Sequence, residues 1–162
     1  MSLKIIYRGH LTDCNYSCEY CPFAKEKNNR EEQALDQYDL NRFVEWVAQN
    51  SSATQTMEIL ITPYGEALVR KWYREAVIRL SHLPFVKKIA VQTNLAFNTE
   101  WLSRCNRSTT ALWTTYHPDF TTEDKFFEKS QELSALQIHH SVGVVGLIII
   151  DFKLCLERFS FL

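Results

Sequence analysis

The sequence has no strong net charge, no long apolar run and no leader peptide. Its 18 lysines and arginines nearly balance 19 aspartates and glutamates, for a net charge of −1. Electrostatics therefore give no case for nucleic acid or an anionic membrane as the main partner. The longest apolar run, residues 142–150, is far shorter than the roughly 20 residues of a membrane-spanning helix. Residues 1–8 lack the apolar stretch and cleavage site of a signal peptide, so we expect a cytoplasmic protein without membrane association.

The chain also has no domain linker, internal repeat or low-complexity tract. Its 162 residues suit one domain of the usual size, about 100–200 residues. Apolar residues at 46% and charged residues at 23% are typical of a folded globular protein. The five cysteines are an odd number with three of them clustered, which fits a reducing compartment where thiols stay free to bind metal.

The clustered cysteines lack the second half of a zinc motif. Cys14, Cys18 and Cys21 have the spacing Cys-x3-Cys-x2-Cys, with Tyr20 before the last cysteine. Three thiolates on one loop suit iron or zinc better than disulfides, but a closed zinc site would need a fourth ligand from a second Cys-x2-Cys or a His pair. A [4Fe-4S] cluster also normally takes four cysteines. Three protein ligands leave one metal position open, as catalytic metal sites do for a substrate or cosubstrate.

This motif resembles the signature of the radical S-adenosylmethionine (radical SAM) superfamily. The resemblance implies that Cys14, Cys18 and Cys21 hold a [4Fe-4S] cluster whose open iron binds the amino and carboxylate groups of S-adenosylmethionine (AdoMet). One electron, from a donor such as flavodoxin or ferredoxin, then cleaves AdoMet to a 5′-deoxyadenosyl radical that abstracts hydrogen from the substrate. The longer string CNYSCEYCPFAK resembles one bacterial subfamily, and the residues do not identify its substrate.

Strand and helix patterns alternate along the chain. Apolar runs predict strands at Leu3–Tyr7, Met57–Thr62, Lys88–Thr93, Ala111–Tyr116 and Ile138–Val145. Helical spacing predicts a helix capped by Asp39, one from Gly65-Glu66 to about Leu80, a short one from Asn98 or Thr99 to about Cys105, and one from Thr121 or Thr122 to about Leu136. Such alternation predicts an α/β fold with a parallel sheet. The resemblance implies a partial (βα)6 TIM-like barrel, with about five βα units in residues 1–146.

Two stretches do not follow this pattern. Residues 24–38 are polar and carry both charge signs, and we expect either a solvated loop or short helix, or a flap over the active site. Residues 147–162 alternate like a strand but follow the fifth strand too closely for a parallel crossover, which needs about a dozen residues. We expect an atypical tail there, from a truncated or frame-shifted chain end or from an edge strand used in a dimer. The open edge of the fifth strand predicts a homo-oligomer.

Candidate AdoMet-binding residues follow the carboxyl ends of the predicted strands, where α/β folds build their sites. Gly65 and Glu66 stand where the family carries Gly-Gly-Glu, with Tyr64 in place of the first glycine. A carboxylate there can accept charge-assisted hydrogen bonds from the ammonium of AdoMet. The alternative for Glu66 is a carboxylate favoured by a helix N-terminus. Thr93 and Asn94 resemble the family's Thr-Asn-Gly, with Leu95 in place of glycine.

Three further residues are implied by the resemblance. Tyr20 matches the aromatic residue whose surrounding backbone meets adenine, and Val145 lies near the position that packs an apolar side chain on adenine. Thr114 or Thr115 would reach the ribose hydroxyls, and we select Thr115. No catalytic residue is assigned. The remaining polar candidates are acid–base groups or satisfy backbone groups at strand ends: His117, His139 and His140.

Two other functions remain open from the residues alone. One is a non-catalytic iron–sulfur or zinc module for electron transfer or assembly, and the other is an inactive truncated fragment that binds the cluster without turnover. A radical SAM enzyme needs an open iron and an ammonium acceptor such as Glu66, whereas a carrier needs neither.

Overall fold

The protein, described by a computed structural model over residues 1–23 and 26–146, has an α/β fold. Its strands are β1 (Ser2–Tyr7), β2 (Thr56–Ile61), β3 (Val86–Thr93), β4 (Thr110–Tyr116) and β5 (His139–Val144). Its α-helices are α1 (Arg30–Asn50), α2 (Lys71–Ser81) and α3 (Glu123–Ala135). Two 3-10 helices, Ala67–Val69 and Glu100–Arg104, complete the described elements. The expected alternation of strands and helices is confirmed.

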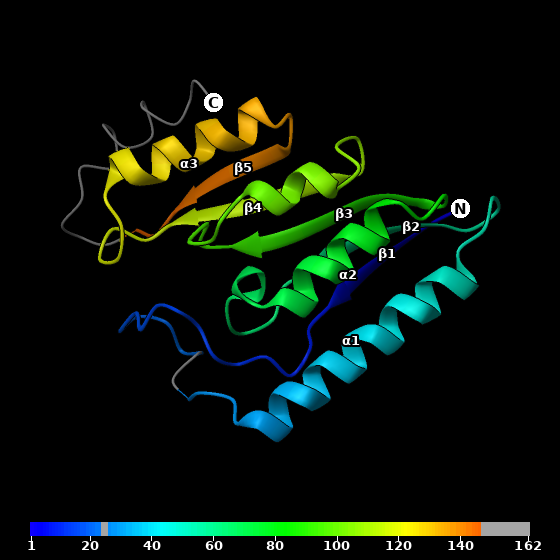
Figure 1. Ribbon diagram of the computed structural model, residues 1–162, viewed down its shortest axis with the longest axis horizontal. Helices are drawn as coiled ribbons and strands as arrows, with labels where there is room; N and C mark the ends of the chain where they lie inside the picture. Colours follow the sequence, from blue (N-terminus) through cyan, green and yellow to red (C-terminus); the bar gives the residue numbers. More distant parts are fainter. Residues whose placement is uncertain (24–25, 147–162) are drawn as a thin grey trace.

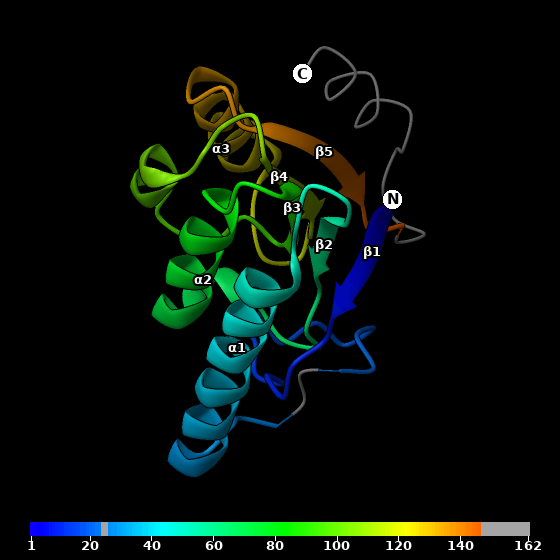
Figure 2. The same cartoon turned by 90° about the vertical axis from the view of Figure 1, so that its right-hand side faces the viewer.

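The strands form one parallel sheet in which spatial order follows chain order, β1-β2-β3-β4-β5. Figures 1 and 2 show α1, α2 and α3 on the same side of this sheet. Burial alternates along β2: Met57, Ile59 and Ile61 are buried, and the residues between them are half-buried. Because side chains alternate between the two faces of a strand, the buried set packs toward the helices.

The other face of the sheet is largely uncovered by the described residues. One row across it runs Ile6, Leu60, Ala90, Ala111 and His139 by strand register. Ile6 is 68% exposed, and Trp113, two residues after Ala111, is 47% exposed. Parallel sheets normally have both faces covered, so this open face is an unusual feature of the described residues.

Helix α1 begins at Arg30, well before Asp39, so the expected helix start was wrong. Asn29 is the N-cap: its side chain accepts hydrogen bonds from the N–H groups of Glu31 and Glu32 at 2.9 and 3.0 Å. The Glu32 carboxylate in turn accepts from the Asn29 N–H at 2.8 Å. This capping box makes residues 30–38 the first turns of α1 rather than a loop or a flap.

The helix expected from Gly65-Glu66 to Leu80 is divided in two. Ala67–Val69 forms a 3-10 turn, Arg70 is extended with φ −92° and ψ 128°, and α2 begins at Lys71. The short helix expected before Cys105 is also 3-10, over Glu100–Arg104. Helix α3 agrees with expectation: Thr122 is its N-cap, and its buried residues are Phe126, Ser130 and Leu133.

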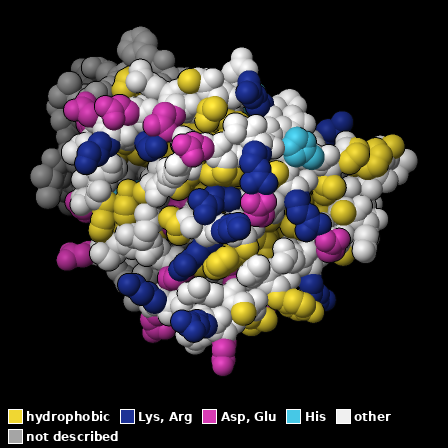
Figure 3. All heavy atoms as spheres, viewed as in Figure 1, with side chains coloured by type: hydrophobic (Ala, Val, Ile, Leu, Met, Phe, Trp, Pro, Cys, Tyr) yellow, Lys and Arg dark blue, Asp and Glu magenta, His cyan; other side chains and the backbone are white. Residues whose placement is uncertain are grey.

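The surface of the helical face carries basic and acidic side chains interspersed with hydrophobic ones (Figure 3). Within residues 1–23 and 26–146, no helix is long and apolar enough to cross a membrane. The expectations for residues 147–162, including the edge strand, lie outside the described residues.

Candidate functional site

A pocket of about 220 Å³ lies at the carboxyl ends of the first four strands. We call it the cysteine pocket. Its lining comes from five separate segments of the chain: Arg8, Cys14, Tyr16, Cys18, Cys21, Phe23, Thr62, Pro63, Tyr64, Gly65, Glu66, Gln92, Thr93, Asn94, Thr115 and His117. A second cavity of about 470 Å³ shares Tyr16 and Asn94 with it and extends along α3. The pocket thus lies at the carboxyl ends of the strands, where ligand sites of parallel α/β sheets are usually found.

The three clustered cysteines line this pocket together, and none of the four described cysteines forms a disulfide. The cysteine loop, residues 14–21, contains a tight turn in which the Cys21 N–H donates to the Cys18 carbonyl at 3.2 Å. Burial raises the pKa of the Cys14 thiol to about 11, so metal binding must displace a proton from it. Among the described residues, no three His, Cys, Asp or Glu side chains are gathered as in a formed metal site. Three free thiols that line one pocket are a donor set that fits an iron–sulfur cluster.

Gly65 brings the turn after β2 against the segment that precedes the cysteines. The Gly65 N–H donates to the Leu11 carbonyl at 3.1 Å, and the Glu66 N–H donates to the Asp13 carbonyl at 3.2 Å. A Cβ atom on Gly65 would overlap the carbonyl group of Asp13. Glycine is therefore needed here for close backbone approach, rather than for an unusual φ angle.

Glu66 lines the pocket and is buried, with 3% of its surface exposed. Its Oε1 accepts from the Leu68 N–H at 3.0 Å and from Thr93 Oγ1 at 2.7 Å, and its Oε2 accepts from the Asn94 N–H at 2.7 Å. Burial raises the pKa of this carboxyl above its ordinary value, and these three hydrogen bonds oppose the rise. A carboxylate offers about four acceptor positions, so Oε2 keeps one for a ligand. Glu66 therefore caps the 3-10 helix and still lines the pocket.

Thr93 and Asn94 connect Glu66 to the cysteine loop. The Asn94 side chain donates to Asn15 Oδ1 at 2.9 Å and lies 3.8 Å from the Cys14 sulfur. Leu95, which occupies the glycine position of the Thr-Asn-Gly motif that the sequence resembles, has φ 62°. This is the left-handed region that favours glycine. The backbone at Leu95 therefore has a conformation typical of glycine, although the residue is leucine.

The structure separates the two threonines of β4. Thr115 lines the cysteine pocket. Thr114 is fully buried on the opposite face of the strand, and its hydroxyl donates to the Ser141 carbonyl at 2.9 Å. Of the two candidates, Thr115 alone can contact a ligand in this pocket.

Two of the predicted residues, Tyr20 and Val145, are not among those that line the pocket. The Tyr20 hydroxyl lies 2.8 Å from His117 Nδ1, and the two rings are stacked. The Val145 N–H donates to the Tyr116 carbonyl at 3.1 Å, which continues the pairing of β5 with β4. Tyr20 thus contacts a lining residue, His117, whereas Tyr116, the partner of Val145, does not line the pocket.

His117, one of three histidines considered, lies in the pocket with its Nδ1 3.6 Å from the Cys18 sulfur. Burial lowers the pKa of His117, and the charge of Asp119 opposes this. His140 instead faces away, with its ring nitrogens 2.8 Å from Ser130 Oγ and 3.0 Å from the Ile138 carbonyl. His139 is exposed and lines neither cavity.

Several lining residues were not anticipated. The Arg8 guanidinium lies 4.9 Å over the Tyr64 ring, and this ring packs on Phe23 at 4.5 Å. Thr62 Oγ1 donates to Gln92 Oε1 at 2.7 Å. Arg8, Thr62 and Gln92 lie at or just beyond strand ends, and that position was the one sequence signal that could have identified them.

No protein-family model and no curated protein matches this chain. Among solved structures, the crystal structure of BtrN in complex with AdoMet and 2-DOIA is similar, with a TM-score of 0.59 and 20% sequence identity. The similarity covers 87% of this chain and 56% of the BtrN chain. At this identity the comparison shows a shared fold, and the present chain spans little more than half the length of BtrN.

Proposed function

We propose that this chain is a radical SAM enzyme that binds a [4Fe-4S] cluster through Cys14, Cys18 and Cys21. The observation that carries the proposal is that these three thiols line one pocket together with the buried carboxylate of Glu66. When bound, the cluster supplies one electron that cleaves AdoMet to a 5′-deoxyadenosyl radical, which abstracts hydrogen from a substrate not yet identified. The complex of BtrN with AdoMet supports the choice of cosubstrate.

The fold supports a partial (βα)6 barrel in residues 1–146. The strands follow one another in chain order, all parallel, as in TIM-like barrels. The cysteine pocket is lined by Arg8, Thr62, Gln92 and Thr115. By alternation these residues lie on the same sheet face as Ile6, Leu60, Ala90 and Ala111, which is the face opposite the helices. We infer that this face is the barrel interior and that the pocket lies at its mouth.

We propose that residues of the cysteine pocket hold AdoMet. The remaining acceptor position of Glu66 suits the AdoMet ammonium, because a buried carboxylate forms strong charge-assisted bonds. Gly65 lets the turn that carries Glu66 pack against the Asp13 carbonyl. Asn94 lies between Glu66 and Cys14, and Thr115 suits the ribose hydroxyls. Tyr20 and Val145 remain proposals for the adenine end, beyond the lining of the pocket. The adjoining cavity at Tyr16 and Asn94 is the candidate space for the substrate.

The proposed reaction needs a one-electron donor such as flavodoxin or ferredoxin. We also propose self-association through β5, because its outer edge has no partner strand among the described residues and unpaired strand edges invite pairing.

The direct test is anaerobic reconstitution with iron and sulfide, followed by reduction with dithionite in the presence of AdoMet. We expect 5′-deoxyadenosine to form. Iron uptake without cleavage of AdoMet would instead identify a non-catalytic iron–sulfur module, and zinc without iron uptake would exclude the radical reaction.

A further inference from the structure

The chain reaches Cys14 through three residues whose backbone N–H groups bind side chains at the start of α1. We call Leu11–Asp13 the lead-in segment. The Leu11 N–H donates to Asp36 Oδ1 at 3.0 Å, and the N–H groups of Thr12 and Asp13 donate to Asn28 Oδ1 at 2.8 and 3.1 Å. The Thr12 hydroxyl donates to the same Asn28 oxygen at 3.2 Å. Two side chains of one region thus satisfy three consecutive amides.

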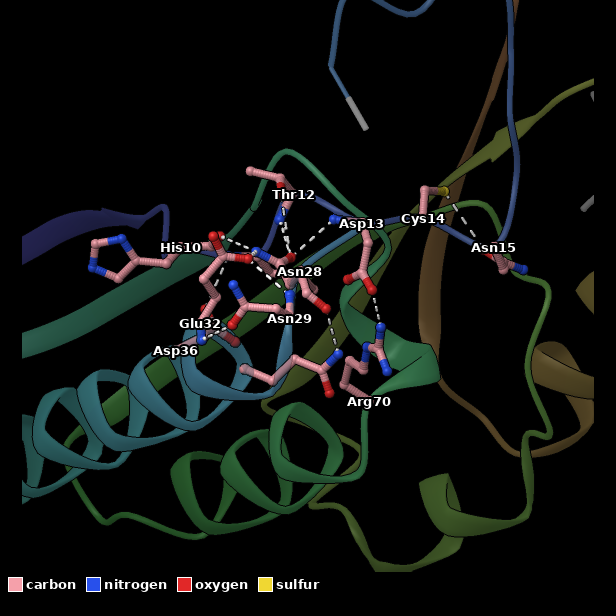
Figure 4. Close-up of polar contacts among 12 residues, drawn as sticks. His10, Thr12, Asp13, Cys14, Asn15, Asn28, Asn29, Glu32, Asp36 and Arg70 are labelled. Atoms are coloured by element: carbon pink, nitrogen blue, oxygen red, sulfur yellow. Dashed lines mark hydrogen bonds and ion pairs between the residues drawn. The ribbon is translucent and has the colours of Figure 1, made fainter. Parts of the chain in front are cut away.

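Asn28 is itself held in place. Its side-chain Nδ2 donates to the His10 carbonyl at 3.4 Å and to the Glu32 carboxylate at 3.5 Å. Its backbone carbonyl accepts from Gln33 Nε2 at 2.8 Å. The side chain is almost fully buried, with the residue 9% exposed. Figure 4 shows Asn28 between the lead-in segment and the first turn of α1. Asn28 is therefore held by Glu32 and Gln33 of α1 and by the His10 carbonyl.

The opposite side of the lead-in segment faces the proposed AdoMet site. The carbonyls of Leu11 and Asp13 accept from the N–H groups of Gly65 and Glu66, and the Asp13 carboxylate is paired with Arg70. The segment thus lies between the start of α1 and the turn that carries Glu66. Its path decides where Cys14 begins relative to Glu66.

We propose that Asn28 is a positioning residue for the site: through Thr12 and Asp13 it sets the place of Cys14 relative to Glu66. The proposal rests on the proposed function as far as Cys14 is a cluster ligand and Glu66 an AdoMet acceptor. Alanine at position 28 would leave buried N–H groups without an acceptor, which costs more than the bonds contribute. Asparagine suits the position because it accepts at Oδ1 and donates at Nδ2, and both functions are used here.

The test compares Asn28→Ala with Asn29→Ala in the full metal-free chain by hydrogen exchange of individual amides. Asn29 is the matched control, because it caps the same helix and its side chain binds the amides of Glu31 and Glu32 instead. In Asn28→Ala the Thr12 and Asp13 amides should exchange at least about tenfold faster, following the loss of their acceptor. In Asn29→Ala they should be unchanged, while the amides of Glu31 and Glu32 become less protected. Asn28→Asp keeps the acceptor oxygen and should retain most of the protection.

The second readout is made on reconstituted protein. Asn28→Ala should take up iron but lose it faster, and should show a changed EPR signal on addition of AdoMet, whereas Asn29→Ala should behave as the parent. Equal exchange of Thr12 and Asp13 in both alanine variants would overturn the proposal and leave Asn28 a helix-stabilising residue. Fast exchange of these amides in the parent would overturn it without any variant. A parent that takes up no iron would refute the proposed function, and the exchange comparison would then decide the role of Asn28 alone.

Discussion

Thr93 donates a hydrogen bond of 2.7 Å from its hydroxyl to the carboxylate of Glu66, which joins the end of β3 to the turn after β2. The same carboxylate accepts from the backbone N–H groups of Asn94 and Leu68. One buried carboxylate therefore holds two segments of the cysteine pocket together, the end of β3 and the turn after β2. Substitution of Glu66 must affect the folded state as well as any ligand.

The first prediction concerns Glu66→Gln in reconstituted protein. Glutamine keeps one acceptor oxygen, but its NH2 group cannot accept from the Asn94 N–H, and a buried donor left unpaired costs about 1–3 kcal/mol. Loss of the charge-assisted bond should also lower AdoMet affinity by roughly one to two orders of magnitude. Calorimetric titration and a melting curve measure the two effects separately. Glu100→Gln is the control, because Glu100 is an exposed carboxylate in the first turn of the other 3-10 helix. A lower melting temperature with unchanged affinity would assign Glu66 to structure only.

The second prediction is a pH dependence of stability that originates at Glu66. The pKa of Glu66 in the folded protein lies above its ordinary value of 4.5 because of burial. As pH rises above 4.5, the unfolded chain releases this proton before the folded protein does, so the folded state holds more protons in that window. The contribution of Glu66 to the free energy of unfolding therefore falls as pH rises through the window. Urea unfolding of parent and Glu66→Gln should show a difference that changes above 4.5; a constant difference would contradict the shift.

The third prediction concerns the cysteines. Replacement of Cys14, Cys18 and Cys21 together by alanine should abolish uptake of iron, which we expect at about four irons and four sulfides per chain for a cubane cluster. Cys105→Ala is the control, because Cys105 is buried among core residues and lines neither cavity. Iron and sulfide analysis with the visible absorption spectrum is the measurement. Equal iron uptake by the triple variant would refute the assignment of ligands.

The fourth prediction compares two glycines. Gly65→Ala should destabilise the protein by about 1–3 kcal/mol, in the range of overpacking, because the new Cβ would overlap the Asp13 carbonyl. It should also weaken iron retention, since Asp13 precedes the first cysteine. Gly143→Ala should be tolerated, because the nearest atoms to its Cβ would lie 3.7 Å away. Denaturant unfolding and iron content of both variants provide the test, and similar behaviour of the two would show that Gly65 is not required for close approach.

The fifth prediction is self-association. The outer edge of β5 carries backbone groups that can pair with another chain. Sedimentation over a dilution series should show a species larger than the monomer that dissociates on dilution. A single monomeric species at every concentration would remove β5 as an interface.

Much of the candidate site could be predicted from short motifs. Cys14, Cys18 and Cys21 lie within one loop, and Glu66 and Asn94 each follow a strand within a few residues, so local spacing was enough to bring them to one edge of the sheet. The capping box of Asn29 and Glu32 was equally local and would have given the start of α1. His117 and Arg8 carry no such motif, and only their positions in space bring them to the cysteines.

The amino-acid sequence by itself determined the alternation of strands and helices, the parallel sheet and the three clustered thiols, because these depend on periodicity and spacing within short segments. The tertiary structure alone decided that Thr115 rather than Thr114 faces the pocket. Alternation places the two threonines on opposite faces of β4, but which face receives the helices depends on packing across the whole sheet. The tertiary structure also decided that Asn28 and Asp36, in the polar stretch before Asp39, accept hydrogen bonds from the lead-in segment. These bonds join residues 15 or more positions apart, so no local pattern predicts them.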